Sequence, residues 1–278
     1  MSRLKRCLAI HDISCVGKCS LTVALPVISA MGSEVASLPT AVLSTHTAGF
    51  TGYTFCDLTE EIPKIAQHWE KENLRFDSIY TGYLGSFTQL EYVSKIIDTF
   101  GKDAAVIIDP VMGDGGKLYT GFTPEFAASM AKLCGKADVI IPNFTEAAFM
   151  LDDMSVLEAK DEDAVKDVLV RLAALGAKHV VLTGVSFEEG KLGVATYDAE
   201  TGKMHTYFNK RINVSMHGTG DVYASVFTGA YMKGYSVEDA ARVAADFAVL
   251  CIERTMDDID NHWYSVKIEA CMKELVNI

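Results

Sequence analysis

The chain has 278 residues and a formal net charge of -12, so it carries no general basic surface for nucleic acid or an anionic membrane. Hydrophobic residues make up 49% of it, which is enough for the core of one large α/β domain. Its seven cysteines are scattered without a C-x-x-C pair, and no apolar run has the length of a signal sequence or a membrane span, so we expect a reduced, cytoplasmic protein.

Short apolar runs alternate along the chain with amphipathic segments of helical length. The runs that predict strands are Arg6–His11, Glu34–Pro39, Ser78–Thr81, Ala104–Ile108, Asp138–Ile141 and His179–Thr183. The segments that predict helices between them are Ser20–Met31, Glu60–Glu72, Thr88–Phe100, Pro124–Cys134 and Glu162–Leu175. Strands that are separated by helices form βαβ crossovers and therefore a mostly parallel sheet.

The pattern changes after residue 190. Lys191–Asp198 and Lys203–Asn209 are joined by a turn without a helix, which predicts an antiparallel hairpin at the edge of the sheet. Two more helices are expected over Asp221–Lys233 and Val237–Arg254. Because there is no linker or repeat, we expect a single α/β domain over residues 1–278, with three αβα layers and helices on both faces of the sheet.

The sharpest motif is Gly218-Thr219-Gly220-Asp221, directly before a predicted helix. The glycines let the backbone turn and approach a ligand, and the free N–H groups of the helix start would form an anion hole for a phosphoryl group. Asp221 would lie at the mouth of this hole, where it could accept the proton of an attacking hydroxyl. The same residues also fit a plain turn with Asp221 as the helix N-cap.

A second polar cluster, from Asp109 to Lys117, follows the strand that ends at Ile108. Asp109 and Asp114 are carboxylates of the kind that bind Mg²⁺, directly or through water. The glycines of the cluster would make it mobile, as a loop that closes over phosphates must be, and Lys117 could meet phosphate charge. The D-G-G sequence is equally a turn signal that would leave Lys117 merely solvated.

Two further segments follow the fifth and sixth predicted strands. Asn143 and Glu146 have the spacing of a helix N-cap and its N3 partner. Glu146 would also face the crevice of the other carboxylates. Thr183 could line a nucleotide or belong to a turn.

One segment, Gly17-Lys18-Cys19-Ser20, is similar to the end of a P-loop but fails that pattern twice. Asp12 stands where the first glycine is required, and Cys19 follows the lysine in place of Ser or Thr. An ATP site in this chain is therefore not a P-loop site. His46 shows no metal-binding spacing, and a satisfied structural histidine is the better interpretation of it.

Together these clusters resemble the ribokinase-like superfamily, and most closely its pyridoxal (vitamin B6) kinase branch, from Leu8 to about Arg254. Gly218-Thr219-Gly220-Asp221 indicates the superfamily, and Thr45-His46-Thr47 with Thr81-Gly82-Tyr83-Leu84-Gly85-Ser86 indicates the branch. The other matching segments are Leu8-Ala9-Ile10, Val16-Gly17, Asp109-Pro110-Val111-Met112-Gly113-Asp114 and Pro142-Asn143 with Glu146.

The resemblance implies ATP-dependent phosphorylation of the 5′-hydroxyl of pyridoxal, pyridoxine or pyridoxamine. It implies Asp221 as the base, with Gly218 and Gly220 in the anion hole. The implied substrate contacts are Asp12, Thr47, Tyr83 and Asp221. The implied ATP contacts are Asp109, Lys117, Asn143, Glu146, Thr183, Arg211 and Thr219, with Asp109, Asp114 and Glu146 as metal ligands. Family members are typically homodimers that use ATP, Mg²⁺ and commonly a monovalent cation, K⁺ or Na⁺.

Asp12 departs from the family pattern, in which Ser and then His follow the first strand in a longer loop. It stands where that Ser usually meets the pyridine ring. A carboxylate at this position would favour a protonated ring nitrogen or a cationic amine, so pyridoxamine would suit this chain. Thr45 likewise replaces the Asn that often precedes the His-Thr pair.

Two other functions stay open. The hydroxymethylpyrimidine kinase branch shares the motif that ends at Asp221, but it usually opens with a glycine-rich S-D-S-G-G-G-A-G stretch that this chain lacks. A non-catalytic B6-binding protein on the same fold would not need Asp221. A sugar or nucleoside kinase is disfavoured, because no lid insertion is apparent between the first two predicted strands.

Overall fold

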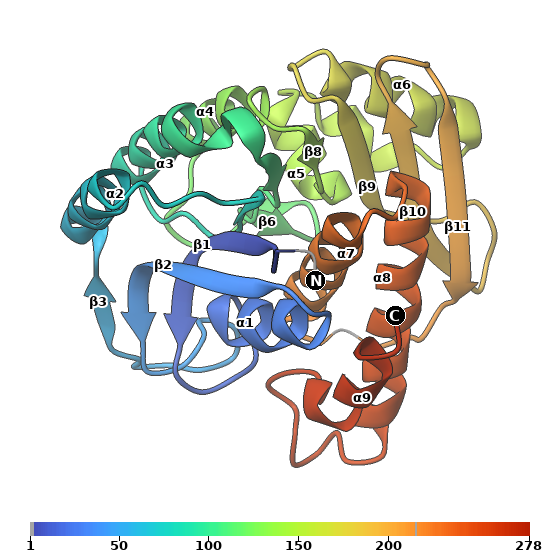
Figure 1. The fold of residues 1–278 in the computed structure, drawn as a ribbon. Helices are drawn as coiled ribbons and strands as arrows, with labels where there is room; N and C mark the ends of the chain where they lie inside the picture. Colours follow the sequence, from blue (N-terminus) through green and yellow to red (C-terminus); the bar gives the residue numbers. More distant parts are fainter. Residues whose placement is uncertain (1–2, 215) are drawn as a thin grey trace.

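The computed structural model describes residues 3–214 and 216–278, which form a nine-stranded mixed sheet between two layers of helices (Figure 1). The strand order is β11-β10-β9-β8-β5-β4-β1-β2-β3. Along the chain these strands are β1 (Arg6–Ser14), β2 (Glu34–Leu43), β3 (Phe55–Asp57), β4 (Ser78–Thr81), β5 (Ala105–Ile108), β8 (Val139–Ile140), β9 (His179–Val185), β10 (Lys191–Asp198) and β11 (Met204–Lys210). A separate two-stranded sheet joins β6 (Gly113–Asp114) to β7 (Lys117–Leu118).

The six central strands from β2 to β9 in this order pair in parallel, as the βαβ pattern predicts. The hairpin of β10 and β11 pairs antiparallel to β9, and β3 pairs antiparallel to β2. The expected αβα arrangement with an antiparallel edge hairpin is therefore confirmed. One domain over residues 1–278 stays a prediction, and residues 1, 2 and 215 of that range lie outside the described part.

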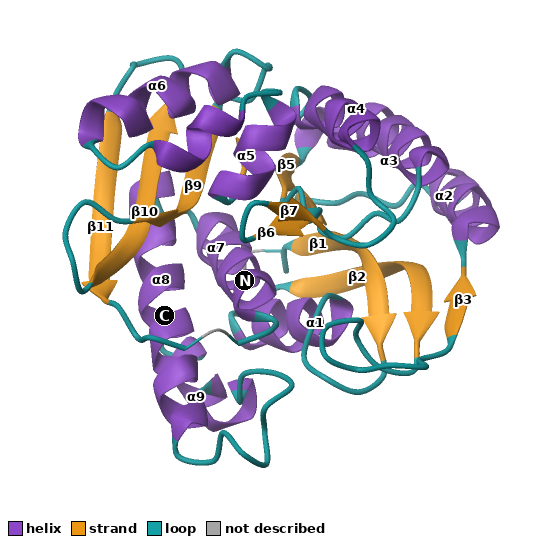
Figure 2. Cartoon of the chain, turned by 180° about the vertical axis from the view of Figure 1, so that it is seen from behind, coloured by secondary structure: helices purple, strands orange, loops and turns teal. Residues whose placement is uncertain are grey.

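Helices cover both faces of the sheet (Figure 2). One face packs against α2 (Ile62–Lys71), α3 (Phe87–Phe100), α4 (Pro124–Cys134), α5 (Phe144–Met150) and α6 (Glu162–Ala173). The other packs against α1 (Leu21–Ala30), α7 (Thr219–Lys233), α8 (Val237–Met256) and α9 (Met272–Leu275). Neighbouring residues of β1 serve opposite cores, Leu8 the first and Ala9 the second, because strand side chains alternate between faces. Within the described ranges, no helix has the length and apolarity needed to cross a membrane.

Local sequence signals explain where several helices begin. The side chains of Ser86, Thr123 and Asp161 each accept a backbone N–H at the start of α3, α4 and α6. Asn143 and Glu146 form a complete capping box at α5, as their spacing predicts. The caps of α3, α4 and α6 involve no candidate site residue, whereas the cap of α5 is formed by two of them.

Two strands run further than their sequence predicts. β1 continues to Ser14 and β2 continues through Pro39 to Leu43. A proline is tolerated in β2 because the register with β1 shifts just beyond the pair His11–Pro39, and because β3 pairs only with Ala41–Leu43. The extension carries Asp12 to the carboxyl end of the sheet as part of a strand rather than a loop.

The sheet changes its direction of winding at β1. From β1 the chain passes through α1 on one face to β2, and then through α2 on the other face to β4, on the opposite side of β1. Open α/β sheets bind ligands in the crevice that this reversal leaves at the carboxyl ends of the two strands. We therefore expect the ligand site among the residues at the carboxyl ends of β1 and β4.

Candidate active site

Asp12 and Tyr83 lie at the carboxyl ends of the neighbouring strands β1 and β4. Asp12 is only 5% exposed, and its carboxylate accepts a hydrogen bond of 3.2 Å from the Ser14 hydroxyl. Burial, and then the charge of Asp12, raises the pKa of the Tyr83 phenol. Asp12 also raises the pKa of Asp221. The register of the two strands pairs Ile10 with Thr81, so Asp12 and Tyr83 each lie two residues beyond a paired position at neighbouring strand ends.

The start of α7 is shaped by Gly218. This residue is the N-cap, it has a left-handed φ of 82°, and no side chain caps the helix. A Cβ atom on Gly218 would lie 2.1 Å from the Lys18 carbonyl oxygen, so only glycine permits the two backbones to touch here. Asp221 is the third residue of α7 and not its N-cap, which removes the capping interpretation of this carboxylate.

Asp221 is half-buried against the loop that joins β1 to α1. Burial, reinforced by the Asp12 charge, raises the pKa of Asp221 to about 7, although a Ser20 backbone N–H and the Cys19 thiol act to lower it. Ser20 has φ 55° and ψ -129°, a conformation that non-glycine residues rarely adopt. This strained backbone places its N–H beside Asp221, while its hydroxyl lowers the pKa of Asp12.

A second acidic group lies after β5 and at the start of α5. Asp109 is 7% exposed, and burial followed by the charges of Glu146 and Asp221 raises its pKa. Burial raises the pKa of Glu146 to about 8. The two Glu146 oxygens accept backbone N–H groups of Asn143 at 2.8 Å and Met112 at 3.2 Å. Glu146 thus ties the segment after β5 to the cap of α5.

The segment expected to be a mobile phosphate loop forms a short hairpin, as its D-G-G turn signal allowed. Gly115 and Gly116 have left-handed φ values of 58° and 78° and form the turn between β6 and β7. Gly116 donates its N–H to the Thr145 hydroxyl at 2.9 Å, and the Asn143 amide donates to the Gly113 carbonyl at 2.9 Å. These bonds fasten the hairpin beneath α5 (Figure 2).

One carboxylate of this group, that of Asp109, suits a magnesium ion. In the described parts of the chain, no three acidic, histidine or cysteine side chains are arranged to hold a metal by themselves. Mg²⁺ in phosphate sites commonly needs only one or two carboxylates, because water and phosphate supply the rest. Asp109 fits this role, since no hydrogen bond from the described residues reaches its carboxylate. Glu146 fits less well, because backbone N–H groups occupy both of its oxygens.

The other predicted contacts are more scattered. Asp114 and Lys117 face each other across the hairpin and are exposed, as is Thr47 in the loop after β2. Thr183 lies in β9 and bridges to Asn143. Arg211 is exposed after β11, the outer strand, which three strands separate from β5.

Tyr119, just after β7, was not predicted by any motif. Burial raises the pKa of its phenol, with further contributions from Glu146, Asp114, Asp109 and Asp221 in that order. The Tyr119 backbone N–H donates to the Met112 carbonyl at 2.9 Å, which places the residue beside the segment after β5, and 45% of the residue is exposed. The position of Tyr119 depends on the hairpin, which the sequence suggested only as a turn.

His46 has the structural role that its sequence context favours. It is 4% exposed, its Nδ1 accepts the Ala48 N–H at 3.1 Å, and its Nε2 therefore carries the proton that it donates to the Tyr264 carbonyl at 2.6 Å. A Cβ atom on Gly17 would lie 2.2 Å from the His46 ring. The ring thus joins the loop after β2 to the loop after β1.

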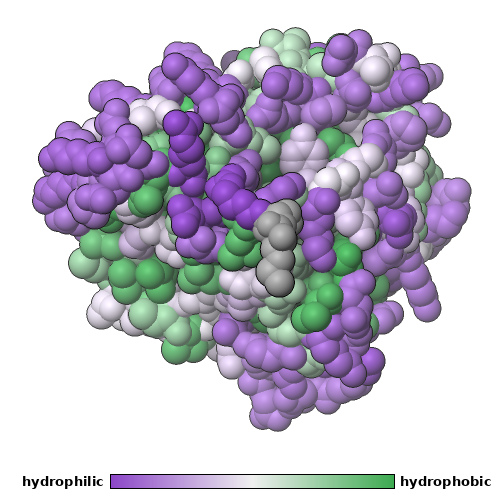
Figure 3. All heavy atoms as spheres, viewed as in Figure 1, coloured by the Kyte–Doolittle hydropathy of each residue, from purple (hydrophilic) through white to green (hydrophobic). Residues whose placement is uncertain are grey.

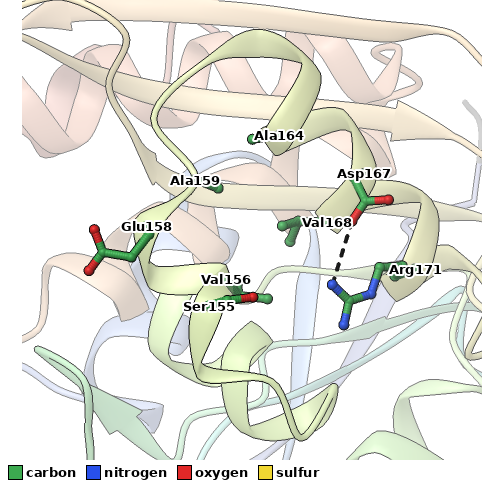
Figure 4. A pocket seen from close by; sticks show the side chains of 8 residues that line it. All are labelled: Ser155, Val156, Glu158, Ala159, Ala164, Asp167, Val168 and Arg171. Carbon is green, nitrogen blue, oxygen red and sulfur yellow. Dashed lines mark hydrogen bonds and ion pairs between the residues drawn. The ribbon is translucent and has the colours of Figure 1, made fainter.

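A pocket of about 180 Å³ lies elsewhere, between α6 and the short 3-10 helix η3 (Met154–Glu158) (Figure 4). The Asp167 and Arg171 side chains form a 3.5 Å ion pair at its rim. None of the predicted site residues lines this pocket. The candidate site is therefore the group at the strand ends.

Comparison with known proteins shows the family of the chain. A model of the phosphomethylpyrimidine kinase family matches residues 23–264. A hydroxymethylpyrimidine/phosphomethylpyrimidine kinase of Bacillus subtilis (strain 168) is 30% identical over 223 residues, which is 78% of each chain.

Two solved structures are similar over nearly the whole chain. A candidate phosphomethylpyrimidine kinase from Bacteroides thetaiotaomicron VPI-5482 has a TM-score of 0.93 at 38% identity and covers 99% of this chain and 94% of its own. A second crystal form of that protein contains pyridoxal. Pyridoxal kinase from Lactobacillus plantarum has a TM-score of 0.91 at 31% identity, covering 99% and 98%. The expected ribokinase-like fold is therefore confirmed.

The two glycines of the α7 start should differ in their effect on folding. Gly218→Ala should lower the free energy of unfolding by at least about 2 kcal/mol, because alanine is strained at positive φ and its Cβ would meet the Lys18 carbonyl. Gly220→Ala should leave it unchanged or raise it by about 0.5–1 kcal/mol, because Gly220 is helical and faces open space. Urea denaturation of both variants measures this, and equal losses would contradict it.

Proposed function

Because the chain belongs to the phosphomethylpyrimidine kinase family, we propose that it transfers the terminal phosphate of ATP to the 5′-hydroxyl of pyridoxal, pyridoxine or pyridoxamine. The observation that carries the proposal is the position of Asp221, in the first turn of α7 and beside the glycine N-cap. A carboxylate base at a helix start combines proton acceptance with an anion hole, which is the pair of functions that phosphoryl transfer to an alcohol requires.

In this mechanism the substrate hydroxyl lies against Asp221, which takes its proton as the oxygen attacks phosphorus. The raised pKa of Asp221, about 7, suits a base that works near neutral pH. The free N–H groups of Thr219 and Gly220 and the positive end of the α7 dipole stabilise the negative charge of the transferring group.

The nucleotide lies, in this proposal, on the side of β5 and α5. Asp109 is the residue that would hold Mg²⁺, and the ion would supply charge neutralisation on the phosphates. Glu146 and Asn143 act chiefly by fixing the segment after β5, because their polar atoms already hold backbone groups. The further nucleotide contacts in this proposal are Lys117, Thr183 and Arg211, with K⁺ or Na⁺ as an additional cation.

The vitamer lies at the crevice between β1 and β4, with the Tyr83 ring, Asp12 and Thr47 as its contacts. The partly buried Tyr83 offers an aromatic surface to a planar ring, and it is close to Asp12. This arrangement supports an aromatic substrate. The Bacteroides relative that was crystallised with pyridoxal and the similar Lactobacillus pyridoxal kinase support a B6 vitamer in particular.

Hydroxymethylpyrimidine phosphorylation is the second candidate, and the 30% identical Bacillus subtilis kinase favours it. Its substrate is also an aromatic ring with a primary hydroxyl, so the Asp221 mechanism would be unchanged. A non-catalytic B6-binding protein is disfavoured, because it would need neither Asp221 nor a glycine at position 220, where a Cβ atom would meet open space.

We also propose a homodimer. The outer strand β3 exposes Phe55 to 51% and has no neighbour on its free edge within the described chain. Figure 3 shows apolar side chains gathered at this edge of the sheet. A second copy of the chain would cover them.

A substrate panel separates the two kinase functions. We expect ATP consumption with at least one of pyridoxal, pyridoxine and pyridoxamine at a kcat/KM at least about tenfold above that for hydroxymethylpyrimidine. The measurement is coupled ADP release, with mass spectrometry of the product. The reverse order would establish the pyrimidine kinase instead, and binding of a vitamer without turnover would favour the binding protein.

Removal of the base should abolish most of the activity. Asp221→Asn should lower kcat at least about a hundredfold, whereas the exposed Asp257→Asn should leave it unchanged. Because Asp221 must be ionised to accept a proton, wild-type kcat/KM should rise with pH and level off above a midpoint near 7. Initial rates between pH 5 and 9 test this, and a flat profile would contradict the assignment.

The anion hole can be tested without disturbing the fold. Gly220→Ala places a methyl group where the proposed phosphate approaches, so kcat/KM for ATP should fall at least about tenfold while stability is kept. Lys166→Ala, at an exposed position in α6, is the control. Unchanged kinetics for Gly220→Ala would place the phosphate elsewhere.

A further inference from the structure

The chain that follows α8 returns to the edge of the sheet where β1 and β2 end (Figure 1). Residues 262–269, called the C-terminal segment below, contact the loops after both of these strands. The Glu269 carboxylate forms a 3.0 Å ion pair with Lys18 in the loop after β1. The Tyr264 carbonyl accepts the ring N–H of His46, in the loop after β2, at 2.6 Å. The C-terminal segment therefore joins two loops that are more than 200 residues away in the sequence.

The loop after β2, residues 44–54, borders the candidate site. The His46 ring lies against Gly17 in the loop after β1, where a Cβ atom would be 2.2 Å from the ring. The centroid of the His46 ring is also 5.6 Å from that of His217, the residue before the Gly218 N-cap of α7. The loop after β2 thus lies next to the proposed anion hole, on the side where the crevice opens between strands.

The outer half of this loop is held by the side chain of Trp263. Within the described chain, no backbone N–H of residues 49–53 forms a hydrogen bond, so their position depends on side-chain packing. The Trp263 ring lies 5.0 Å from the Phe50 ring, and a Cβ atom on Gly49 would be 2.8 Å from it. Gly49 also has a left-handed φ of 82°. Only glycine therefore lets the loop lie flat against this ring.

Trp263 is well placed to hold a loop, because the chain after it is anchored in the core. Val266 and Ile268 are buried against the face of the sheet that α8 covers. The Lys267 backbone N–H donates to the Thr255 hydroxyl of α8 at 2.8 Å. Trp263 itself is 48% exposed, so it adds little to this core. An exposed ring on an anchored segment serves the neighbouring loop more than the stability of the fold.

We propose that Trp263 is a positioning residue for the phosphate acceptor, which holds the loop after β2 in its binding conformation without touching the reacting atoms. This inference rests on the proposed kinase function, because it assumes that the crevice holds the acceptor. Thr47, the proposed acceptor contact in this loop, lies between His46 and Gly49, which the C-terminal segment contacts directly. The C-terminal segment is thus part of the acceptor side of the site.

The proposal separates acceptor binding from chemistry. A loop that is already ordered loses less conformational entropy when a ligand binds, so acceptor affinity should depend on Trp263. The ring neighbours of Trp263 are Gly49, Phe50 and Tyr264, and none of them belongs to α5, α7 or the β6–β7 hairpin. The affinity for ATP and the phosphoryl transfer step should therefore be kept when Trp263 is changed.

The test compares Trp263→Ala with Trp263→Phe, which keeps an aromatic ring, and with Met154→Ala, a control at an equally exposed position beside α6. Steady-state kinetics give kcat and both KM values. Calorimetry without ATP gives the Kd of pyridoxal, pyridoxine, pyridoxamine and hydroxymethylpyrimidine. Trp263→Ala should raise the acceptor KM and Kd at least about tenfold, with kcat and the ATP KM within about twofold of wild type. Trp263→Phe should recover most of the loss, and Met154→Ala should change nothing.

A double-mutant cycle tests the contact itself. Gly49→Ala directs a methyl group into the Trp263 ring, whereas in a Trp263→Ala background that clash is gone and only the strain at positive φ remains. Gly49→Ala should therefore weaken acceptor binding at least about threefold less in the Trp263→Ala background than in wild type. Additive effects of the two substitutions would contradict positioning through this contact.

The binding measurement keeps this inference separate from the proposed reaction. Turnover with an unchanged acceptor KM in Trp263→Ala would overturn the role of Trp263 and leave the kinase proposal intact. Equal increases in both KM values would show a general structural effect and would also overturn it. A Trp263-dependent Kd for one of the four compounds, without turnover of any, would support the inference and remove the kinase activity. Binding of none of them to the wild type would overturn the inference.

Discussion

The site depends on one backbone contact, between the loop after β1 and the start of α7. The absent side chain of Gly218 lets this residue lie against the Lys18 carbonyl, and the contact brings residues 17–20 to residues 218–221. Ser20 then places its N–H beside one carboxylate and its hydroxyl beside another. The strained backbone of Ser20 is held by this packing, and the geometry of both acids follows from it.

Burial disfavours the charged form of each of the four acids of the site. Asp12, Asp109, Glu146 and Asp221 all have raised pKa values, with burial as the largest cause in each. Glu146 is compensated by two backbone N–H groups. In the part of the chain that the structure describes, no lysine, arginine or histidine forms an ion pair with the other three. In the proposed reaction, a metal ion on the nucleotide would bring positive charge near them.

The layers and the main motif could be predicted because strong local signals specify them. Alternating apolar runs and helices predicted the parallel sheet, and Gly218 to Asp221 predicted a helix start with an acid beside it. The hairpin of β6 and β7 could not be predicted with confidence, because its order comes from Asn143 and Thr145, which are distant in sequence. Tyr119 was missed for the same reason, and Ser20 because its strain arises from tertiary packing.

The hydrogen bond between His46 and Tyr264 joins residues 218 positions apart. During synthesis the loop after β2 is thus made long before Tyr264, whose carbonyl binds it. The motif at Gly218 is also made long after β1 and β2. Chains that fold during synthesis must keep β1 and β2 without their final partners for most of translation. A nascent chain can therefore assemble much of its sheet, yet it gains the bond between His46 and Tyr264 only after residue 264 has been made.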